Sequence, residues 1–246
     1  MKVLFLTDAH LGAGTDTLDR ERQLCRLIQR EQRGLDKLIL LGDIFDFWFT
    51  YHRVVPKGHT RLLGKLAELS DLGVEIHYFI GNHDMWLFDY LQQEIGAIMH
   101  PDPATLQIDG KRILLGHGDG LGHLDKKYDF LKWMFRCPFN QWLFKLFPSS
   151  FSFWIATSWS GSSRKSHPYE EQHYLGDDRE GIVIWIKEQI ARESVDYCIF
   201  GHRHTPVDIN IQSHNGNTCR YVNVGDFITH RSYAIMQDGE LTLLND

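Results

Sequence analysis

The sequence predicts a mixed α/β fold in which two β-sheets are stacked and helices cover their outer faces. Three observations support this prediction. Short apolar runs, typical of buried strands, alternate with amphipathic helical segments through the first half of the chain. The same alternation returns around residues 178–201, and short strand-like runs joined by turn dipeptides close the sequence. Alternating strands and helices favour parallel pairing, and terminal hairpins favour antiparallel pairing, so a layered architecture accommodates both.

The first half supplies three expected strands and three expected helices. The strands are short apolar runs: Lys2–Thr7, Lys37–Leu41 and Glu75–Ile80. The helices carry apolar residues three and four positions apart: Leu18–Arg33, Thr60–Leu72 and Asp84–Ile95. In the third of these helices, Asp84 is placed to cap the first turn.

The second half combines one more helix with several hairpins. The dipeptide Asp109-Gly110 predicts a tight turn between strands at Thr105–Ile108 and Arg112–Gly116. Residues Asp178–Ser194 carry isoleucines at helical spacing, and an apolar strand is expected directly after them at Tyr197–Phe200. Turn dipeptides then separate four further short strands: Asp208–Gln212, Arg220–Val224, Tyr233–Met236 and Leu241–Leu244.

The region from Leu121 to about Tyr174 interrupts this rhythm. Residues 121–165 hold 12 of the 31 aromatic residues and carry a net charge of +5, whereas the rest of the chain carries −11. We interpret the region as an inserted helical cap, so that residues 1–120 and 175–246 form the core and residues 121–174 the cap. Interleaved aromatic and basic residues favour contact with lipid and anionic headgroups. For any single aromatic residue, packing of the cap on the core is the better interpretation.

Composition excludes several classes of protein. With 43% hydrophobic and 24% charged residues, the chain is neither disordered nor fibrous. Its net charge of −6 argues against non-specific nucleic-acid binding, so no nucleic-acid partner is expected. Four scattered cysteines without a CxxC pair argue against a disulfide framework or a zinc ribbon and favour a reducing compartment. Neither a signal peptide nor a transmembrane run is visible, so we expect a cytoplasmic protein.

Five polar motifs follow apolar runs, at or near predicted strand ends. They are Asp8-Ala9-His10, Gly42-Asp43-Ile44-Phe45-Asp46, Gly81-Asn82-His83-Asp84, Gly116-His117-Gly118-Asp119 and Gly201-His202-Arg203-His204. Ligand sites in α/β sheets form outside the carboxyl ends of strands, so five such loops can converge. Their Asp, His and Asn donors suit Mn, Fe or Zn. The donors exceed what one metal ion needs, whereas two ions sharing a carboxylate would use them all, an arrangement suited to displacement at phosphorus.

Each motif has an ordinary explanation when it is taken alone. Asp-x-His and Gly-Asp are common in turns, Asn82-His83-Asp84 can be a helix cap, and His117 can be a buried, hydrogen-bonded histidine. The segment from His202 to His204 can be a plain loop. Five such motifs in this order, each after a strand, make coincidence improbable, and we therefore expect a metal centre.

The set resembles the calcineurin-like metallophosphoesterase superfamily, whose pattern is D-x-H, G-D-x-x-D, G-N-H-D/E, G-H and G-H-x-H. The resemblance implies a four-layer α/β/β/α sandwich and two divalent metal ions. One ion would be held by Asp8, His10, Asp43 and His204. The other would be held by Asp43, Asn82, His117 and His202, with Asp43 bridging the two ions.

The same resemblance assigns roles to three neighbouring residues. His83 would contact the phosphate and could protonate the leaving group. Asp84 would either orient His83 or cap the following helix, and the two roles are equally favoured. Asp46 is expected to be structural rather than a metal ligand.

The chain is also similar, nearly end to end, to the UDP-2,3-diacylglucosamine pyrophosphatases of lipid A biosynthesis. The similarity includes GDIFDFW (Gly42–Trp48) and HGDGL (His117–Leu121), and GNHDMW (Gly81–Trp86) and FGHRH (Phe200–His204) are typical of the Bacteroidetes-type branch. It implies that water attacks the α-phosphorus of UDP-2,3-diacylglucosamine, giving UMP and 2,3-diacylglucosamine 1-phosphate (lipid X), with Mn²⁺ the expected metal. The cap would hold the acyl chains, at the cytoplasmic face of the inner membrane, and no obligate protein partner is evident.

Substrate contacts are also implied by this resemblance. Asp125 and Ser163 match substrate-contacting positions of the family. Arg164 and Lys165 would meet the diphosphate, although an ordinary solvated basic turn is an equally good interpretation of this pair. The remaining expected contacts are Asn82, His83 and His202. Proteobacterial members carry Arg where this chain has His83, the residue usual in the superfamily.

Three other functions remain open. A metallophosphoesterase acting on another nucleotide diphosphate or lipid phosphate would share the five motifs without needing an acyl-binding cap. A non-catalytic scaffold of this fold would be expected to lack metal ligands, and no ligand is missing here. A nuclease would need the basic cap to bind nucleic acid against the overall negative charge.

Overall fold

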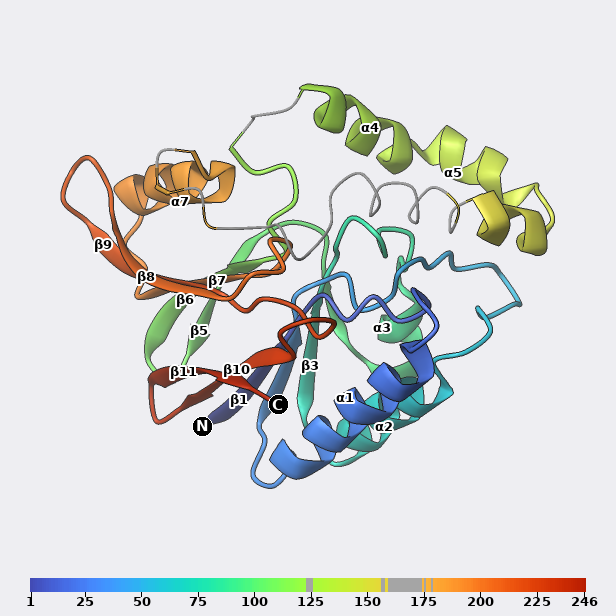
Figure 1. The fold of residues 1–246 in the computed structure, drawn as a ribbon, viewed down its shortest axis with the longest axis horizontal. Helices are drawn as coiled ribbons and strands as arrows, with labels where there is room; N and C mark the ends of the chain where they lie inside the picture. Colours follow the sequence, from blue (N-terminus) through green and yellow to red (C-terminus); the bar gives the residue numbers. More distant parts are fainter. Residues whose placement is uncertain (123–125, 156–157, 159–173, 175, 178) are drawn as a thin grey trace.

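Two β-sheets stacked face to face form the centre of the structure, a computed structural model that describes residues 1–122, 126–155, 158, 174, 176–177 and 179–246 (Figure 1). The first sheet has the strand order β11-β10-β1-β2-β3-β4. Its strands are β1 (Lys2–Leu6), β2 (Lys37–Leu40), β3 (Glu75–Phe79), β4 (Ile98–His100), β10 (Ser232–Gln237) and β11 (Glu240–Asn245). Strands β1 to β4 are parallel, and β10 and β11 add an antiparallel hairpin at one edge.

The second sheet has the strand order β5-β6-β7-β9-β8. Its strands are β5 (Ala104–Ile108), β6 (Lys111–Gly116), β7 (Tyr197–Phe200), β8 (Val207–Gln212) and β9 (Thr218–Asn223). Strands β6, β7 and β9 are parallel, while β5 and β8 are antiparallel to their neighbours. Parallel strands at the centre of both sheets place several carboxyl ends at the same edge of the molecule.

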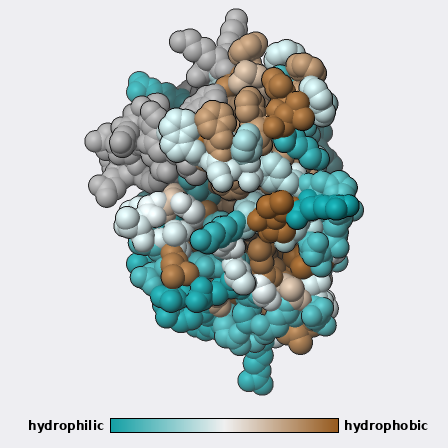
Figure 2. Space-filling model, turned by 90° about the vertical axis from the view of Figure 1, so that its right-hand side faces the viewer, coloured by the Kyte–Doolittle hydropathy of each residue, from teal (hydrophilic) through white to brown (hydrophobic). Residues whose placement is uncertain are grey.

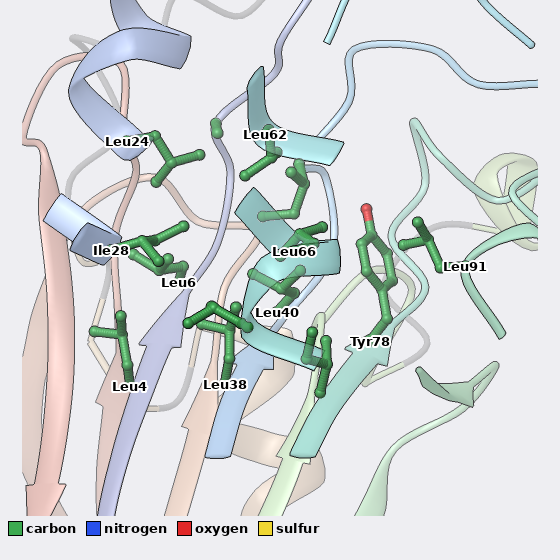
Figure 3. Packing of buried hydrophobic residues seen from close by; sticks show 14 of the residues in the cluster. Leu4, Leu6, Leu24, Ile28, Leu38, Leu40, Leu62, Leu66, Tyr78 and Leu91 are labelled. Atoms are coloured by element: carbon green, nitrogen blue, oxygen red, sulfur yellow. The ribbon is translucent and has the colours of Figure 1, made fainter. Parts of the chain in front are cut away.

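Helices cover the outer face of each sheet. Helices α1 (Thr17–Glu31) and α2 (Thr60–Asp71) pack on the first sheet, and α7 (Gly181–Arg192) packs on the second (Figure 1). Strand β1 shows how the layers are divided, because alternate side chains point to opposite faces. Leu4 and Leu6 join Leu24, Ile28 and other residues under the helices (Figure 3), whereas Val3 and Phe5 lie between the sheets. The predicted α/β/β/α layering is therefore confirmed.

The segment after β6 adds two helices beyond the layers, α4 (Lys126–Arg136) and α5 (Pro138–Lys145), followed by a helical segment over residues 149–155 (Figure 1). Hydrogen bonds and ring contacts are among the interactions that hold them to the core. The Trp86 indole donates a hydrogen bond to the Phe135 carbonyl oxygen at 2.9 Å, and the Phe144 ring lies 5.1 Å from Phe49 and 4.6 Å from Trp86. None of the helices in the described part of the chain is long and apolar enough to cross a bilayer.

Two elements differ from the sequence prediction. The helix expected over Asp84–Ile95 is shorter, because α3 comprises only Tyr90–Ile95. Phe88 has a left-handed backbone with φ of 48°, which ends any helical turn started at Asp84, and the buried Trp86 and Leu87 side chains anchor this stretch as a loop. Strand β4 was not predicted, since it is only three residues long and lies at the sheet edge.

Candidate active site

All five predicted motifs converge at the carboxyl ends of five strands. Asp8 and His10 follow β1, Asp43 follows β2, Asn82 and His83 follow β3, His117 follows β6, and His202 and His204 follow β7. Backbone hydrogen bonds tie neighbouring loops together. The Asp8 amide donates to the Gly42 carbonyl oxygen at 3.1 Å, and the Gly201 amide donates to the His117 carbonyl oxygen at 2.9 Å. The site therefore lies across the edge shared by both sheets.

The backbone at this edge is tightly turned. Five of the seven expected metal ligands have left-handed φ angles between 41° and 69°: Asp8, His10, Asp43, His202 and His204. Such conformations cost about 1 kcal/mol or more for a residue with a Cβ atom, and they cluster at functional sites. Glycine permits two close approaches here, since a Cβ atom at Gly81 would lie 2.2 Å from Asp43 Oδ1 and one at Gly201 would lie 2.1 Å from Thr7 Oγ1.

One cluster of donors is formed by Asp8, His10 and His204. The Oδ1 atom of Asp8 lies 3.6 Å from His10 Nε2 and 3.4 Å from His204 Nε2. The other carboxylate oxygen, Oδ2, accepts hydrogen bonds from the Thr7 hydroxyl at 2.6 Å and the His202 amide at 2.8 Å. The carboxylate is thereby oriented, with Oδ1 facing the two imidazoles.

A second cluster surrounds Asp43. Its Oδ2 atom lies 3.3 Å from His117 Nε2 and 3.6 Å from His10 Nε2, so Asp43 stands between the two clusters. The Asn82 Oδ1 atom lies 3.2 Å from His117 Nε2. The Nδ1 atom of His117 donates to the Leu41 carbonyl oxygen at 2.7 Å, which leaves Nε2 directed toward Asp43.

The donors fit divalent metal ions. In Asp8-His10-His204 and in Asp43-His117-His202, one ligand atom per residue can be chosen so that all lie within 4.8 Å of one another. The buried Asp8 Oδ1 atom accepts no hydrogen bond from any residue that the structure describes, although a buried carboxylate oxygen normally has a partner. Carboxylate oxygens and imidazole nitrogens without thiolates suit Mn, Fe or Zn. The two groupings correspond to the two predicted ligand sets, with Asp43 within reach of both.

Charges within the site favour ionised carboxylates. Burial by itself raises the pKa of Asp8, but the His204 and His10 rings outweigh it and lower this pKa to about 2. Burial and the neighbouring His117 lower the pKa of His202 to about 4. An ionised carboxylate and a neutral imidazole are the forms that bind metal ions. Although burial lowers the pKa values of His10 and His117, the neighbouring carboxylates raise both, so a metal ion bound there would displace a proton from each ring.

Two buried carboxylates that were not predicted as ligands orient the histidines. Asp226 Oδ2 accepts a hydrogen bond from His204 Nδ1 at 3.3 Å, and its Oδ1 accepts the Thr229 and His230 amides at 2.8 Å each. Sequence analysis missed Asp226. The signal was present, because Gly225-Asp226 follows a strand just as Gly42-Asp43 does. Metal-binding histidines usually donate their second N–H to such a partner.

Asp46 is the second of these carboxylates. Its Oδ1 atom lies 3.4 Å from His10 Nδ1 and 3.5 Å from His83 Nδ1. The His83 Nδ1 atom also lies 3.0 Å from the Asp46 carbonyl oxygen, to which it donates. His83 also lines the neighbouring cavity. The position of Asp46 fits the predicted structural role, although Asp46, His10 and His83 also form a third grouping with metal-like spacing.

Asp84 takes neither of the two positions expected for it. Its carboxylate accepts hydrogen bonds from the Gly81 amide at 2.9 Å, the Ile44 amide at 3.0 Å and the Tyr78 hydroxyl. Because these donors belong to the loops after β2 and β3, Asp84 fixes the Asn82 loop against the Asp43 loop. The expected helix cap is wrong, since α3 begins only at Tyr90. Burial and the nearby Asp43 raise the pKa of Asp84 to about 6.

A cavity of about 380 Å³ opens beside His83, between the core and the helices after β6. Its lining includes Asp46, Asn82 and His83, and the rest of its walls are mainly apolar. The apolar walls comprise Phe47, Trp48, Met85, Trp86, Leu131, Phe135, Phe144, Phe147 and Ile155. The cavity thus joins a cluster of metal-binding donors to a slot suited to hydrocarbon.

One wall of this cavity is tied to the loop that carries His117. Asp119 is buried, and its Oδ2 atom lies 2.7 Å from Lys132 Nζ and accepts the Tyr128 hydroxyl at 2.9 Å. Both partners belong to α4. A change in the position of α4 would therefore disturb the loop after β6.

Four predicted substrate contacts, Asp125, Ser163, Arg164 and Lys165, lie outside the described residues. The other three, Asn82, His83 and His202, lie at the site, and the first two line the cavity. The structure therefore brings together every predicted metal-ligand residue and His83, while Asp84 lies beneath them and supports their loops.

Comparisons with known proteins agree with this geometry. A family model described as calcineurin-like phosphoesterase matches residues 1–206. A Porphyromonas gingivalis protein named UDP-2,3-diacylglucosamine hydrolase is 38% identical, over 98% of this chain and 96% of its own length. An Aeromonas salmonicida protein of the same name is 28% identical, over 99% of this chain and 92% of its own length. A solved structure described as a novel archaeal phosphodiesterase aligns with a TM-score of 0.50 at 15% identity, covering 99% of each chain, and this likeness supports the fold alone.

Proposed function

The chain belongs to the calcineurin-like phosphoesterase family, and from this premise we propose that it hydrolyses UDP-2,3-diacylglucosamine to UMP and 2,3-diacylglucosamine 1-phosphate. The observation that carries the proposal is the cavity between the core and α4–α5. Its lining combines Asn82 and His83 with aromatic and aliphatic side chains. A diphosphate attached to a diacylated sugar needs both environments in one continuous site.

Two divalent metal ions, with Mn²⁺ as the proposed species, fit the donor clusters. Asp8, His10, Asp43 and His204 would hold one ion, and Asp43, Asn82, His117 and His202 would hold the other. Such a pair supplies an activated water nucleophile and neutralises the charge that develops on the phosphoryl oxygens. The two sets share Asp43, whose Oδ2 atom lies between His10 and His117.

The residues of the chain then position the diphosphate and manage its charge. His83, held through Nδ1 by the Asp46 carbonyl oxygen, lines the cavity and would contact the phosphate that leaves with the lipid. A protonated His83 would donate to that leaving oxygen as the bond to the α-phosphorus breaks. Water adds to the α-phosphorus and loses its proton, so UMP carries the new oxygen atom.

The proposed cap is residues 121–174, and its described part carries the acyl-binding walls. Phe135 and Phe144 are positioned over Trp86, so the cap wall is built on the loop that also carries His83. Asp125, Ser163, Arg164 and Lys165 are proposed as substrate contacts on the resemblance to the family alone. Lys132 also lines the cavity, where its Nζ atom forms an ion pair with Asp119.

The outer surface of the cap favours a peripheral location on the cytoplasmic face of the inner membrane. Several large apolar side chains are exposed there: Phe130, Trp133, Phe139, Trp142, Leu143, Leu146, Phe151 and Trp154. Figure 2 shows hydrophobic residues gathered at the top of the molecule, on the side where α5 lies in Figure 1. Exposed aromatic residues beside basic ones such as Arg136 and Lys145 suit a lipid interface.

Hydrolysis in ¹⁸O-labelled water tests the proposed reaction. With Mn²⁺ present, UDP-2,3-diacylglucosamine should give UMP that carries one labelled oxygen atom and an unlabelled lipid 1-phosphate, as read by mass spectrometry. Label in the lipid phosphate would place the attack on the other phosphorus and contradict the proposed orientation. No cleavage of this substrate, beside cleavage of bis-p-nitrophenyl phosphate, would favour a phosphoesterase with a different substrate.

A further inference from the structure

The loop between β2 and α2 exposes two adjacent aliphatic side chains at its tip. Val54 is 56% exposed and Val55 is 47% exposed, and the basic residues Arg53 and Lys57 lie on either side of them, both exposed. A single exposed apolar residue is ordinary on a protein surface. Two neighbouring β-branched residues between two cations form the pattern of a segment that enters a bilayer surface while its cations meet anionic headgroups.

The base of this loop is anchored, so its tip is presented in a defined position. Pro56 is buried, and helix α2 begins only four residues later, at Thr60. On the other side, Phe49 is buried and its ring lies 4.7 Å from that of Tyr51. The exposed valines therefore lie between two fixed points.

The same loop is continuous with the proposed cap. The Phe49 ring lies 5.1 Å from Phe144 of α5, so the chain emerges from beneath α5 just before it reaches the valines. In Figure 1 the segment between β2 and α2 reaches out on the side on which α5 lies. Figure 2 views that side and shows hydrophobic residues both over the cap and again below it.

Apolar surface also extends behind the loop. A groove of about 610 Å³ lies between the loop, α2 and α3, with Val55, Leu63, Ala67 and Ile95 among its lining residues. Lys57 and Glu94 also line this groove, so the groove itself carries charges of both signs, and the cations that would meet anionic headgroups are those of the loop, Arg53 and Lys57.

We propose that residues 53–57 form a second membrane contact, which together with the outer surface of the cap fixes the orientation of the protein on an anionic bilayer. The inference rests on the proposed function only in taking the cap as the first membrane contact. Because the cavity beside His83 lies between the core and the cap, contacts on both sides of α5 would hold that cavity close to the lipid surface. The substrate could then enter with its acyl chains remaining near the bilayer.

Vesicle sedimentation tests the proposal with the full-length, Mn²⁺-loaded protein. The vesicles contain phosphatidylethanolamine and phosphatidylglycerol, with phosphatidylcholine vesicles as the uncharged comparison. The double variant Val54→Asp/Val55→Asp should bind the anionic vesicles about tenfold more weakly. Arg53→Gln/Lys57→Gln should weaken binding mainly at low salt, because headgroup attraction is screened by ions.

Leu72→Asp is the matched control. Leu72 is 66% exposed and lies at the opposite end of α2, about 18 Å from the loop for a twelve-residue helix. It should bind the vesicles as tightly as the unmodified protein does. Hydrolysis of bis-p-nitrophenyl phosphate should be unchanged in all three variants, which shows that each is folded and retains its metal site.

The outcomes separate the loop from the proposed function. Unweakened binding by Val54→Asp/Val55→Asp, or an equal loss in Leu72→Asp, would overturn the loop proposal, as would failure of the unmodified protein to bind anionic vesicles. Weakened binding by the loop variant together with no cleavage of UDP-2,3-diacylglucosamine in detergent would support the membrane contact and reject the substrate. Cleavage of UDP-2,3-diacylglucosamine in detergent, together with vesicle binding that the loop substitutions do not weaken, would support the substrate and reject the membrane contact.

Discussion

The donor clusters and the helices after β6 are built on opposite principles. Asp8, His10 and Asp43 are almost completely buried polar residues, and each is held by hydrogen bonds or close contacts to its neighbours. In the proposed cap, Trp133 and Phe139 are both 64% exposed, although they are among the largest apolar side chains. The donor clusters bury charged side chains away from water, whereas the proposed cap leaves large apolar side chains exposed to water.

This difference indicates what each region is expected to meet. Buried carboxylates and imidazoles on left-handed backbone are costly unless something compensates their charge, and divalent ions do so. Exposed aromatic surface is costly unless an apolar phase covers part of it, and lipid does so. The cavity lined by both His83 and Phe144 lies where the two regions meet.

Removing the shared carboxylate should have the largest effect. Asp43→Ala should lower kcat/KM at least about 1,000-fold for any phosphodiester, because both proposed ions lose a ligand. Metal analysis should find less than one ion retained per chain, while circular dichroism should be unchanged. Retention of two tightly bound metal ions by this variant would show that Asp43 is not a metal ligand.

A substitution of His83 should show whether this residue takes part in the chemical step or holds a metal ion. His83→Ala should slow turnover about 100-fold, the range typical of a lost proton donor, with nearly full metal content. The readouts are single-turnover rates and metal analysis of the same preparation. An emptied site would show that His83 holds metal rather than acting on the phosphate.

Two substitutions within α5 distinguish the role of the proposed cap from the role of the donor clusters. Phe144→Ser should lower kcat/KM for UDP-2,3-diacylglucosamine about 30-fold, because Phe144 lines the cavity and packs on Trp86. Phe139→Ser changes an exposed ring on the same helix and should have little effect in detergent. Hydrolysis of bis-p-nitrophenyl phosphate should be similar in both. Equal losses on both substrates would mean that Phe144 supports the fold and not the acyl chains.

Asp226 should show a smaller effect that is specific to metal affinity. Asp226→Asn should weaken metal binding about tenfold, because His204 loses the carboxylate that orients its ring. Calorimetric titration with Mn²⁺ measures this. Asp208→Asn, which changes a surface carboxylate paired with Arg220 on neighbouring strands, should leave the affinity unaltered.

The smallest expected effect concerns a pair of histidines on neighbouring strands, His77 and His100. His77 Nδ1 and His100 Nε2 lie 2.9 Å apart on β3 and β4, and His77 Nε2 lies 2.6 Å from Glu75 Oε1. Burial and the adjacent His77 lower the pKa of His100 to about 4, so the contribution of its neutral form to stability is complete above pH about 6.5 and is lost as pH falls toward 4. Because His100 is partly exposed, the loss should be only about 1 kcal/mol. Thermal unfolding with and without Mn²⁺ measures it, and His100→Gln should flatten the dependence.

Much of the site was predictable because its residues obey a local rule. Asp8, Asp43 and His117 each follow an apolar run, and the topology of parallel strands brings such positions together. Asp226 was missed although it obeys the same rule, because only one polar residue marks it. Asp84 was misjudged because its hydrogen bonds go to Gly81 and Ile44, and the second of these contacts depends on how two loops meet in space.

The strands and helices were likewise predicted well where the local sequence determines them and poorly where tertiary packing does. Strands such as Lys37–Leu40 were identified closely, since burial on both faces leaves a continuous apolar run. The short edge strand Ile98–His100 carries no such signal. The start of α3 at Tyr90 was also missed, because the positive φ of Phe88 follows from tertiary packing of its neighbours rather than from propensity.

Substrate preference tests the central claim most directly. The Mn²⁺-loaded protein is given UDP-2,3-diacylglucosamine, UDP-glucose and bis-p-nitrophenyl phosphate, and kcat/KM is measured for each with products identified by mass. Joint action of the donor clusters and the apolar cavity predicts release of UMP from the diacylated substrate, with a kcat/KM at least about 100-fold above that for UDP-glucose. Equal rates for the two UDP-sugars, or cleavage of the simple diester alone, would retain the phosphoesterase and contradict the lipid substrate.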